Sequence, residues 1–262
     1  MFNDLIRVFE ASDQDYRQLV VALMLSPYYR ASNVFGEVSG ARAIELSEVG
    51  TARFLTPELL SRKIHAVTGI RWDRGWDRSE QLTTDFDILY GGIDSDLVTD
   101  RLQDPNGVMA AVALRMANEV SCRATAYDFS LPVAQRSLFP DVELTTMPLA
   151  MDGSPDAAGA TAVRTAIVRL HERFFGETLS PSDPEIERTY QLFVETMRSG
   201  RAALTAETER RWLTWSCQAR VNPATGEDLP MTQRIDQDPQ YVIRSWMAVV
   251  TYLLSDYRFL HD

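Results

Sequence analysis

The chain has 262 residues, a formal net charge of −11 and an ordinary globular composition, with 45% hydrophobic and 24% charged residues. A chain of this length buries enough surface to fold without disulfides or metal ions. This composition excludes disorder over most of the length. Because a negative surface repels phosphate groups, the charge also argues against generic binding to nucleic acids or anionic lipids.

Neither a membrane span nor an export signal is evident. The longest apolar run, Trp246 to Leu254, is under half the ~20 residues that a spanning helix needs. The first residues, MFNDLIRVFEASDQDYR, lack the basic start and the apolar stretch of a secretory signal. We therefore expect a soluble protein, cytoplasmic if the sequence is complete, or exported if a signal lies elsewhere.

Two helices are predicted toward the N-terminus. Ser12 or Asp13 can cap the first, which the sequence Ser26-Pro27 interrupts or ends. The second begins at Thr56-Pro57-Glu58, where a capping residue, a proline and an acid follow one another, and Gly69 ends it. Both are predicted from local signals alone.

A long buried helix is predicted at the centre of the sequence. Asp104-Pro105 opens an apolar segment from Val108 to about Ala126 that is apolar on most sides, as a central helix would be. Residues 142–149 predict a short strand or an extended strap. Residues 151–160 are small, polar and turn-forming, which is typical of a linker.

The second half of the chain predicts a helical hairpin. An apolar face from Val163 to Phe174 indicates a helix that ends at Gly176. Asp183-Pro184 begins its partner, which we expect to end before Gly200. The short link between them makes the pair an αα-hairpin.

A last helix is predicted from Asp238-Pro239, running from Gln240 to about Leu260, with an apolar face that must dock into the core. The fold class is therefore all-α, a helical array around the central helix with little or no β structure. We expect an N-terminal helical domain over residues 1–150 and a C-terminal helical subdomain over 161–262, packed on the first.

A glycine-rich acidic loop is the candidate metal site. Gly91-Gly92 allows a tight turn, and Asp94 and Asp96 at i and i+2 place two carboxylates where a hard cation such as Ca²⁺ can bind. The EF-hand pattern is absent. The alternative is a loop followed by an Asp- or Ser-capped helix.

A small duplication of Trp-Asp-Arg is the candidate partner-binding loop. Trp72, Arg74, Trp76 and Arg78 belong to residue types that are enriched at binding hot spots. The alternative is a surface loop held by Arg–Asp pairs, with its tryptophan rings tucked into the core.

The central helix also carries a polar cluster. Glu119 and Arg123, four residues apart, predict a structural ion pair. Cys122 has no histidine base near it in sequence, so a nucleophilic role is disfavoured. Cys122 and Cys217 can pair as a disulfide that staples a loop-rich segment to this helix, or stay as buried thiols, and both readings remain open.

Two further residue groups are interpreted as structural. Trp212 and Trp215 precede Cys217 in a loop-rich segment that a disulfide to Cys122 would staple to the central helix; the alternative is a core loop anchored by these aromatic rings with a free buried thiol. His65, His171 and His261 are too scattered to predict a site, and each is expected to be a bystander.

Two segments resemble secreted, multi-domain proteins first noted in planctomycetes. Leu19–Arg30 (LVVALMLSPYYR) resembles their A-L-L-x-S-P-x-F-x-x-R stretch, and Phe54–Ile64 (FLTPELLSRKI) is similar to their E-L-A-S-R-L segment. The closing YLLSDYRFL resembles their C-terminal segments. Those proteins carry helical domains of uncharacterised function, commonly beside a cytochrome c-type haem domain. The resemblance implies export and a nearby redox partner, with no site residues to carry over.

The chain departs from that family in two places. It lacks the haem-attachment motif C-x-x-C-H, and Lys63-Ile64-His65 replaces the aromatic stretch that follows the second segment. A covalently attached haem c would therefore belong to a partner.

The sequence thus supports two functional hypotheses. The first is a non-catalytic interaction or scaffold subunit, in the periplasm or outside the cell, that docks a protein partner such as a c-type cytochrome. The second is a Ca²⁺-dependent enzyme with an acidic site around Asp94 and Asp96. No other cofactor is indicated, no nucleic-acid partner is expected, and no complete catalytic constellation is present.

Overall fold

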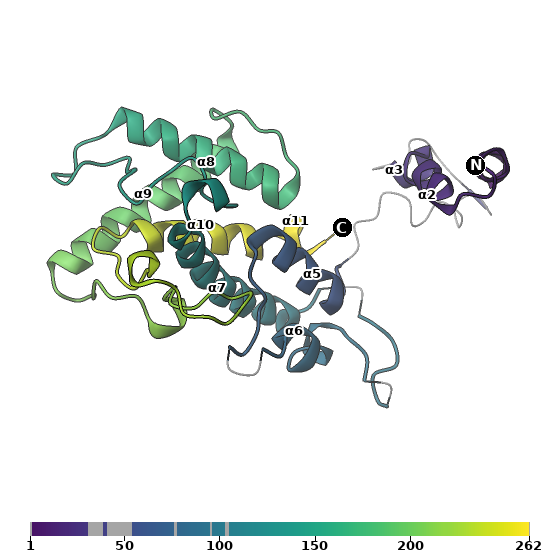
Figure 1. Ribbon diagram of the computed structural model, residues 1–262, viewed down its shortest axis with the longest axis horizontal. Coiled ribbons are helices and arrows are strands. Elements are labelled where there is room, and N and C mark those ends of the chain that lie inside the picture. The colour runs from purple at the N-terminus through teal and green to yellow at the C-terminus, as the bar shows by residue number, and fades with distance from the viewer. Residues whose placement is uncertain are drawn as a thin grey trace. The chain divides into compact units, whose positions relative to one another are not determined.

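The computed structural model describes residues 2–30, 39–40, 54–75, 78–94, 96–102 and 105–261. The chain forms two compact units, Met1–Arg53 and Phe54–Asp262. The all-α prediction is confirmed: the described residues form helices, and their β structure is limited to isolated bridges (Figure 1). None of the helices in these ranges is both long and apolar enough to cross a membrane.

The first unit contains a helical hairpin. Its helices are α1 (Phe2–Ala11), α2 (Tyr16–Met24) and α3 (Pro27–Arg30). The cap of α2 is Asp15, whose side chain accepts a hydrogen bond from the Arg17 N–H at 2.8 Å, and not Ser12 or Asp13 as predicted. The reason is that Asp13, with φ 55°, belongs to the left-handed turn that separates α1 from α2.

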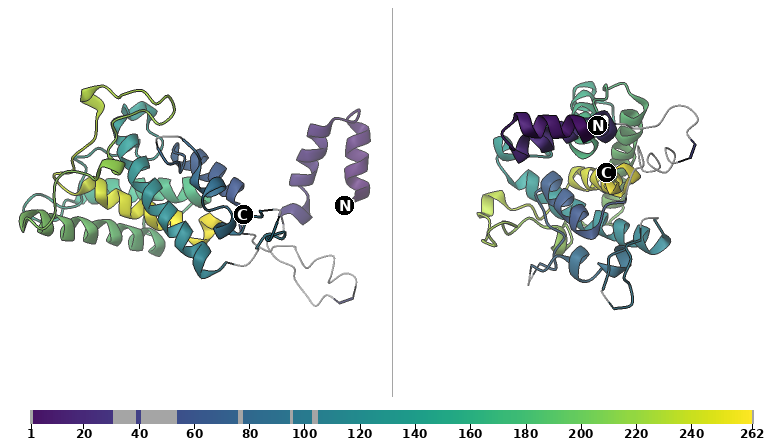
Figure 2. Two further views of the ribbon diagram at one scale, coloured as in Figure 1. Left: turned by 90° about the horizontal axis from the view of Figure 1, so that it is seen from below. Right: turned by 90° about the vertical axis from the view of Figure 1, so that its right-hand side faces the viewer.

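The second unit holds a larger helical array. Its α-helices are α5 (Pro57–Thr68), α6 (Gln81–Thr84), α7 (Gly107–Ser130), α8 (Ala157–Phe175), α9 (Pro184–Thr205), α10 (Val242–Ser255) and α11 (Tyr257–Leu260). Four short 3-10 helices join them: η1 (Ile88–Tyr90), η2 (Val133–Gln135), η3 (Trp215–Cys217) and η4 (Met231–Gln233). Helix α7 runs through the middle and packs along α10, which also packs on α9 (Figures 1 and 2).

Local capping chemistry sets both ends of α5, the end of α8 and the start of α9, as predicted. Thr56 accepts a hydrogen bond from the Leu59 N–H at the start of α5, and Gly69, with φ 74°, ends that helix. Gly176 ends α8 with φ 70°, and Asp183 caps α9 through the Glu185 N–H. These side chains satisfy backbone groups that a helix end leaves unpaired.

Helix α7 differs from the prediction at both ends. It is capped by Asn106, whose side chain accepts from the N–H groups of Val108 and Met109, and it continues past Ala126 to Ser130. Asp104, the expected start, lies outside the described residues. The C-terminal extension places Asp128 in the core, where it holds the chain that follows.

The last predicted helix is two helices. Asp256 interrupts it and caps α11 by accepting from the Arg258 N–H at 2.8 Å. At the other end Asp238 is buried and accepts from the N–H groups of Ile243 and Arg244, at 3.2 and 2.9 Å. Burial raises the pKa of Asp238, against the effect of these hydrogen bonds.

The core of this unit contains side chains from both sides of the predicted linker. Trp246 on α10 is fully buried between Phe139 and Phe193, whose ring centres lie 5.0 and 4.5 Å from its own. Residues 142–149 form neither a strand nor an extended strap but an irregular segment with a turn, in which the Thr146 N–H donates to the Glu143 carbonyl at 2.9 Å, and a bridge joins Leu149 to Pro155. Helices before and after residues 151–160 therefore share one hydrophobic core.

Helix α9 continues through Gly200 to Thr205, although the glycine was expected to follow its end. The glycine is needed for packing, because a Cβ at this position would lie 2.0 Å from the ring of Tyr241. We expect Gly200→Ala to lower the free energy of unfolding by about 2 kcal/mol, the usual cost of overpacking, measured by urea denaturation.

Gly107→Ala is the matched control, because a Cβ there meets nothing within 4 Å. It should leave the stability unchanged or raise it by up to about 1 kcal/mol. Equal stability of the Gly200 variant and the wild type would contradict the close contact between α9 and Tyr241.

Candidate partner-binding groove

Residues 206–241, between α9 and α10, form an irregular segment that we call the lobe. Three isolated bridges organise it, joining Trp212 to Gln237, Ala219 to Ile235 and Val221 to Asp228. A small second hydrophobic cluster lies beneath it, separate from the main core, and consists of Ala126, Leu213, Ala219, Leu229 and Ile243. The lobe is thus a loop-rich structure with its own core.

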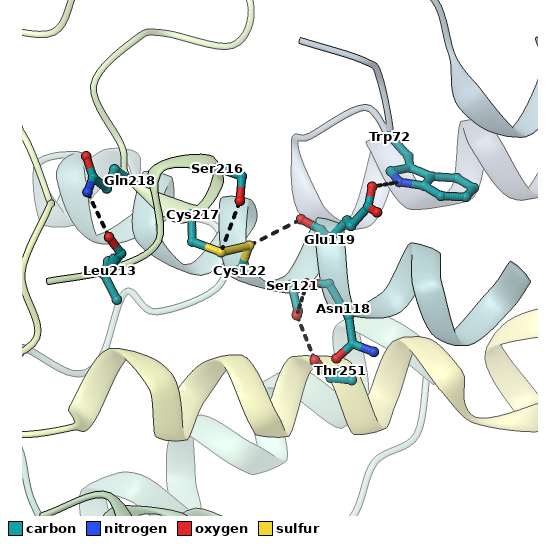
Figure 3. Close-up of a disulfide and its surroundings, with 10 residues drawn as sticks. All are labelled: Trp72, Asn118, Glu119, Ser121, Cys122, Leu213, Ser216, Cys217, Gln218 and Thr251. Carbon is teal, nitrogen blue, oxygen red and sulfur yellow. Dashed lines mark hydrogen bonds between the residues drawn. A yellow bond between two sulfur atoms is a disulfide. The ribbon is translucent and has the colours of Figure 1, made fainter. Parts of the chain in front are cut away.

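A disulfide fixes the lobe to the central helix. Cys217 in η3 is bonded to Cys122 on α7, with sulfur atoms 2.18 Å and Cα atoms 5.0 Å apart (Figure 3). The sequence left two possibilities open, a disulfide or two buried thiols, and the structure contains the disulfide. A bonded Cys122 holds no thiol, so it offers no nucleophile in this state.

A groove lies between the lobe, α7 and residues 70–75 and 78–81, with a volume of about 1030 Å³. Cys122 belongs to its wall, so the disulfide borders the groove. Five arginines also line it: Arg74, Arg78, Arg115, Arg123 and Arg220. Among the described lining residues, two carboxylates, those of Asp73 and Glu119, accompany them, so this described lining has more basic than acidic groups in an acidic protein.

Most of these arginines are held in place by ion pairs. Arg74 pairs with Asp85, Arg115 with Glu119, Arg123 with Asp73 and Arg220 with Asp236. Arg78 differs: it donates to the backbone carbonyls of Pro223 and Ala224, at 2.9 and 3.5 Å, and contacts no carboxylate among the described residues. It therefore ties the loop to the lobe across the groove.

Glu119 organises one wall of the groove. Its carboxylate accepts from Trp72 Nε1 at 2.8 Å, from Arg115 Nε at 2.8 Å and from Gln81 Nε2 at 3.3 Å (Figure 3 shows the Trp72 bond). Burial raises the pKa of Glu119, but the hydrogen bonds from Trp72 and Arg115 outweigh it and hold the pKa below its ordinary value. Glu119 is therefore an ionised positioning group and not a proton donor near neutral pH.

The predicted Glu119–Arg123 ion pair is wrong. Glu119 pairs with Arg115, one turn earlier on α7, and with the indole of Trp72. Arg123 instead reaches Asp73 at 3.0 Å, on the loop that crosses α7. Glu119 and Arg123 thus each bind another partner, which their i, i+4 spacing on the helix does not reveal.

The Trp-Asp-Arg loop is divided between core and groove. Trp72 is only 3% exposed and stacks on Phe86 with ring centres 5.1 Å apart, so its ring belongs to the core and not to an accessible surface. Arg74 and Arg78 line the groove. Trp76 lies outside the described residues.

The tryptophans of the lobe are exposed, so the alternative of a core loop anchored by these rings is wrong. Trp215, at the groove, is 76% exposed, and Trp212 is 53% exposed. The guanidinium of Arg220 lies over the ring of Trp215, 4.8 Å from its centre. Val221 and Met231 add further exposed apolar surface to the lobe. The core contact is made instead by Leu213, between the two rings in sequence.

The acidic loop after η1 is a turn held by its own backbone. Asp94 Oδ1 accepts from the N–H groups of Asp96, Leu97 and Val98, each at 2.9 Å. The N–H groups of Val98 and Asp96 hold the pKa of Asp94 below its ordinary value. Asp96 is exposed, and no three metal-binding side chains cluster within the described ranges. A calcium site at Asp94 and Asp96 stays a prediction.

The histidines lie apart from the groove. His65 is exposed on α5, and His171 is fully buried between Glu177 and Thr189, at 3.4 and 3.3 Å. His261 is buried beside the backbone carbonyl of Tyr257, which lies 2.8 Å from its Nδ1. None of the three is part of the groove lining.

Comparison with known proteins gives no relative. The sequence matches no protein-family model, no curated protein and no solved structure.

Proposed function

We propose that this chain is a non-catalytic subunit that docks a partner protein against the lobe and its groove. The observation that carries the proposal is Trp215, a large aromatic side chain that is 76% exposed at the rim of a groove, on a segment anchored by a disulfide. Tryptophan and arginine are the residue types that contribute most to binding energy at protein interfaces. Here Trp215 and Arg220 form a contacting pair.

The lobe is well suited to this role because it is held in place before any partner binds. Besides the disulfide, Gln218 Nε2 donates to the Leu213 carbonyl at 2.8 Å, and Arg244 donates to the Trp212 carbonyl at 2.7 Å. A surface that needs no ordering on binding loses less entropy in the complex. An irregular segment with these fixed contacts is therefore suited to recognition of a partner.

Two different observations support the proposed partner and compartment. The resemblance of residues 19–30 and 54–64 to secreted multi-domain proteins names a c-type cytochrome as the partner to test first. A disulfide persists in oxidising compartments such as the periplasm or the extracellular space. We therefore place the complex outside the cytoplasm.

We expect Trp215→Ala to weaken the complex with the native partner by at least about 2 kcal/mol, or roughly thirty-fold in Kd. The reason is the loss of an exposed aromatic side chain at the centre of the proposed contact. The measurement is isothermal titration calorimetry, in which the oxidised chain is titrated into the purified partner.

Leu97→Ala is the control variant, since Leu97 is 93% exposed and lies outside the lobe and the groove lining. It should bind like the wild type. If Trp215→Ala also bound the partner with unchanged affinity, the lobe would not be the docking surface.

A further inference from the structure

The groove has a charge opposite to that of the chain as a whole. The formal net charge is −11, yet the described lining residues include five arginines and two carboxylates, and counting Asp85 and Asp236, which pair with Arg74 and Arg220 from outside the lining, still leaves an excess of one positive charge. Positive charge concentrated in a concave site attracts anions and speeds their association. The lining therefore selects for a negatively charged occupant.

The arginines keep binding capacity despite their ion pairs. A guanidinium has five N–H donors, and the hydrogen bonds of Arg78 to described residues are those from two of its nitrogens to main-chain carbonyls. Arg220 donates from Nε to Gln218 and from Nη2 to Asp236, the latter at a distance of 3.4 Å. Planar guanidinium groups of this kind suit bidentate contacts with carboxylates.

The positive charges are distributed along the groove and do not converge on one point. Arg115 and Arg123 are both on α7, eight residues apart, which corresponds to a rise of about 12 Å along the helix. Arg220 adds a third charge from the lobe. A single inorganic anion cannot contact groups separated in this way, whereas an extended chain with several carboxylates can.

Size and apolar surface favour a peptide among the anionic chains. The volume of about 1030 Å³ is at the upper end of the range for small-molecule sites. The Trp215 ring offers an apolar side chain of the occupant a flat surface beside the arginines. A nucleic acid would extend beyond the groove onto the acidic remainder of the protein, where its phosphates would be repelled.

We infer that the groove binds a short acidic segment of a protein partner, with its carboxylates on Arg78, Arg115 and Arg220 and an apolar side chain against Trp215. This inference rests on the proposed function and specifies the chemistry of the partner. The disulfide between Cys122 and Cys217 (Figure 3) borders the groove and fixes η3, which contains Trp215 and precedes Arg220 in the chain, to the helix that carries Arg115 and Arg123. Recognition would then depend on the oxidised state of the chain.

The test uses the full oxidised chain and a fluorescent twelve-residue peptide that contains six Glu or Asp residues and one Phe. We expect saturable binding by fluorescence anisotropy, weakening as salt is raised. The matched peptide has Gln and Asn in place of the acids and should bind at least ten-fold more weakly. Equal binding of the two peptides would overturn the inference, as would tighter binding of a single-stranded twelve-nucleotide DNA.

The variant Arg115→Gln/Arg220→Gln should bind the acidic peptide at least ten-fold more weakly. Arg220→Lys keeps the charge and should retain part of the affinity. The control is Arg198→Gln, because Arg198 lies on α9, is paired with Glu195 and is outside the groove. Circular dichroism melts establish that each variant is folded, and unchanged binding by a folded double variant would overturn the inference.

The two proposals fail in different ways. A partner complex that depends on Trp215 but not on Arg115 or Arg220, with no affinity for the acidic peptide, would overturn the acidic-segment inference and leave the docking function standing. If the chain binds the acidic peptide but forms no complex with a partner protein, the groove's preference for acidic peptides is supported and the proposed docking function is overturned.

Discussion

Replacing both cysteines, Cys122→Ser/Cys217→Ser, is expected to lower the free energy of unfolding by about 4 kcal/mol. The bond closes a loop between residues 95 apart in sequence, and closing a long loop removes much of the conformational freedom of the unfolded chain. The measurement is urea denaturation of the oxidised wild type and the double variant.

The control is to add a dithiol reductant to both proteins. The wild type should fall to the stability of the variant, which should itself be unaffected. Trypsin should also cleave more rapidly after the arginines of the lobe, such as Arg210 and Arg220, once the disulfide is reduced. A wild type with the same urea midpoint with and without reductant would contradict the structural role of the disulfide.

Asp128→Ala is expected to lower the free energy of unfolding by roughly 4 kcal/mol. The side chain is buried, and its carboxylate accepts from the N–H groups of Ser137, Leu138 and Phe139, at 2.8, 3.2 and 2.9 Å. Removing it leaves three backbone donors unpaired inside the protein, and each unpaired group costs about 1–3 kcal/mol. Thermal or urea denaturation measures the loss.

Asp152→Ala provides the comparison for this prediction. Asp152 also accepts two hydrogen bonds, from the N–H and hydroxyl of Ser154, but in an exposed turn where water can replace them. Asp152→Ala should lower the free energy of unfolding by less than about 1 kcal/mol. A similar small loss for Asp128→Ala would show that the connection after α7 is held by other contacts.

The fold was predictable where the signals are local. Thr56 and Gly69 mark the ends of α5, and Asp183 the start of α9, because a cap needs only the few residues beside it. Asp256 has the same chemistry but follows an apolar run, so the end of α10 was missed. Gly200 was mistaken for a helix end, because its role depends on Tyr241, a distant residue that packs against it.

The groove was not predictable from spacing, because its lining comes from three separate segments. Arg115 on α7 and Arg220 on the lobe lie 105 positions apart in the numbering, and no periodicity links them. The Trp-Asp-Arg duplication did indicate Arg74 and Arg78, but it gave no sign that Trp72 would turn inward to Glu119. Cys122 and Cys217 were the one sequence signal that joined the lobe to the central helix.

The central claim is that this chain works as part of a complex, and its partner can be sought directly. The measurement is light scattering with a visible absorption trace on the chain purified gently from its native source. We predict a stoichiometric hetero-complex with a Soret band, the haem belonging to the partner because this sequence has no C-x-x-C-H motif. A colourless species with the mass of the single chain would contradict the account.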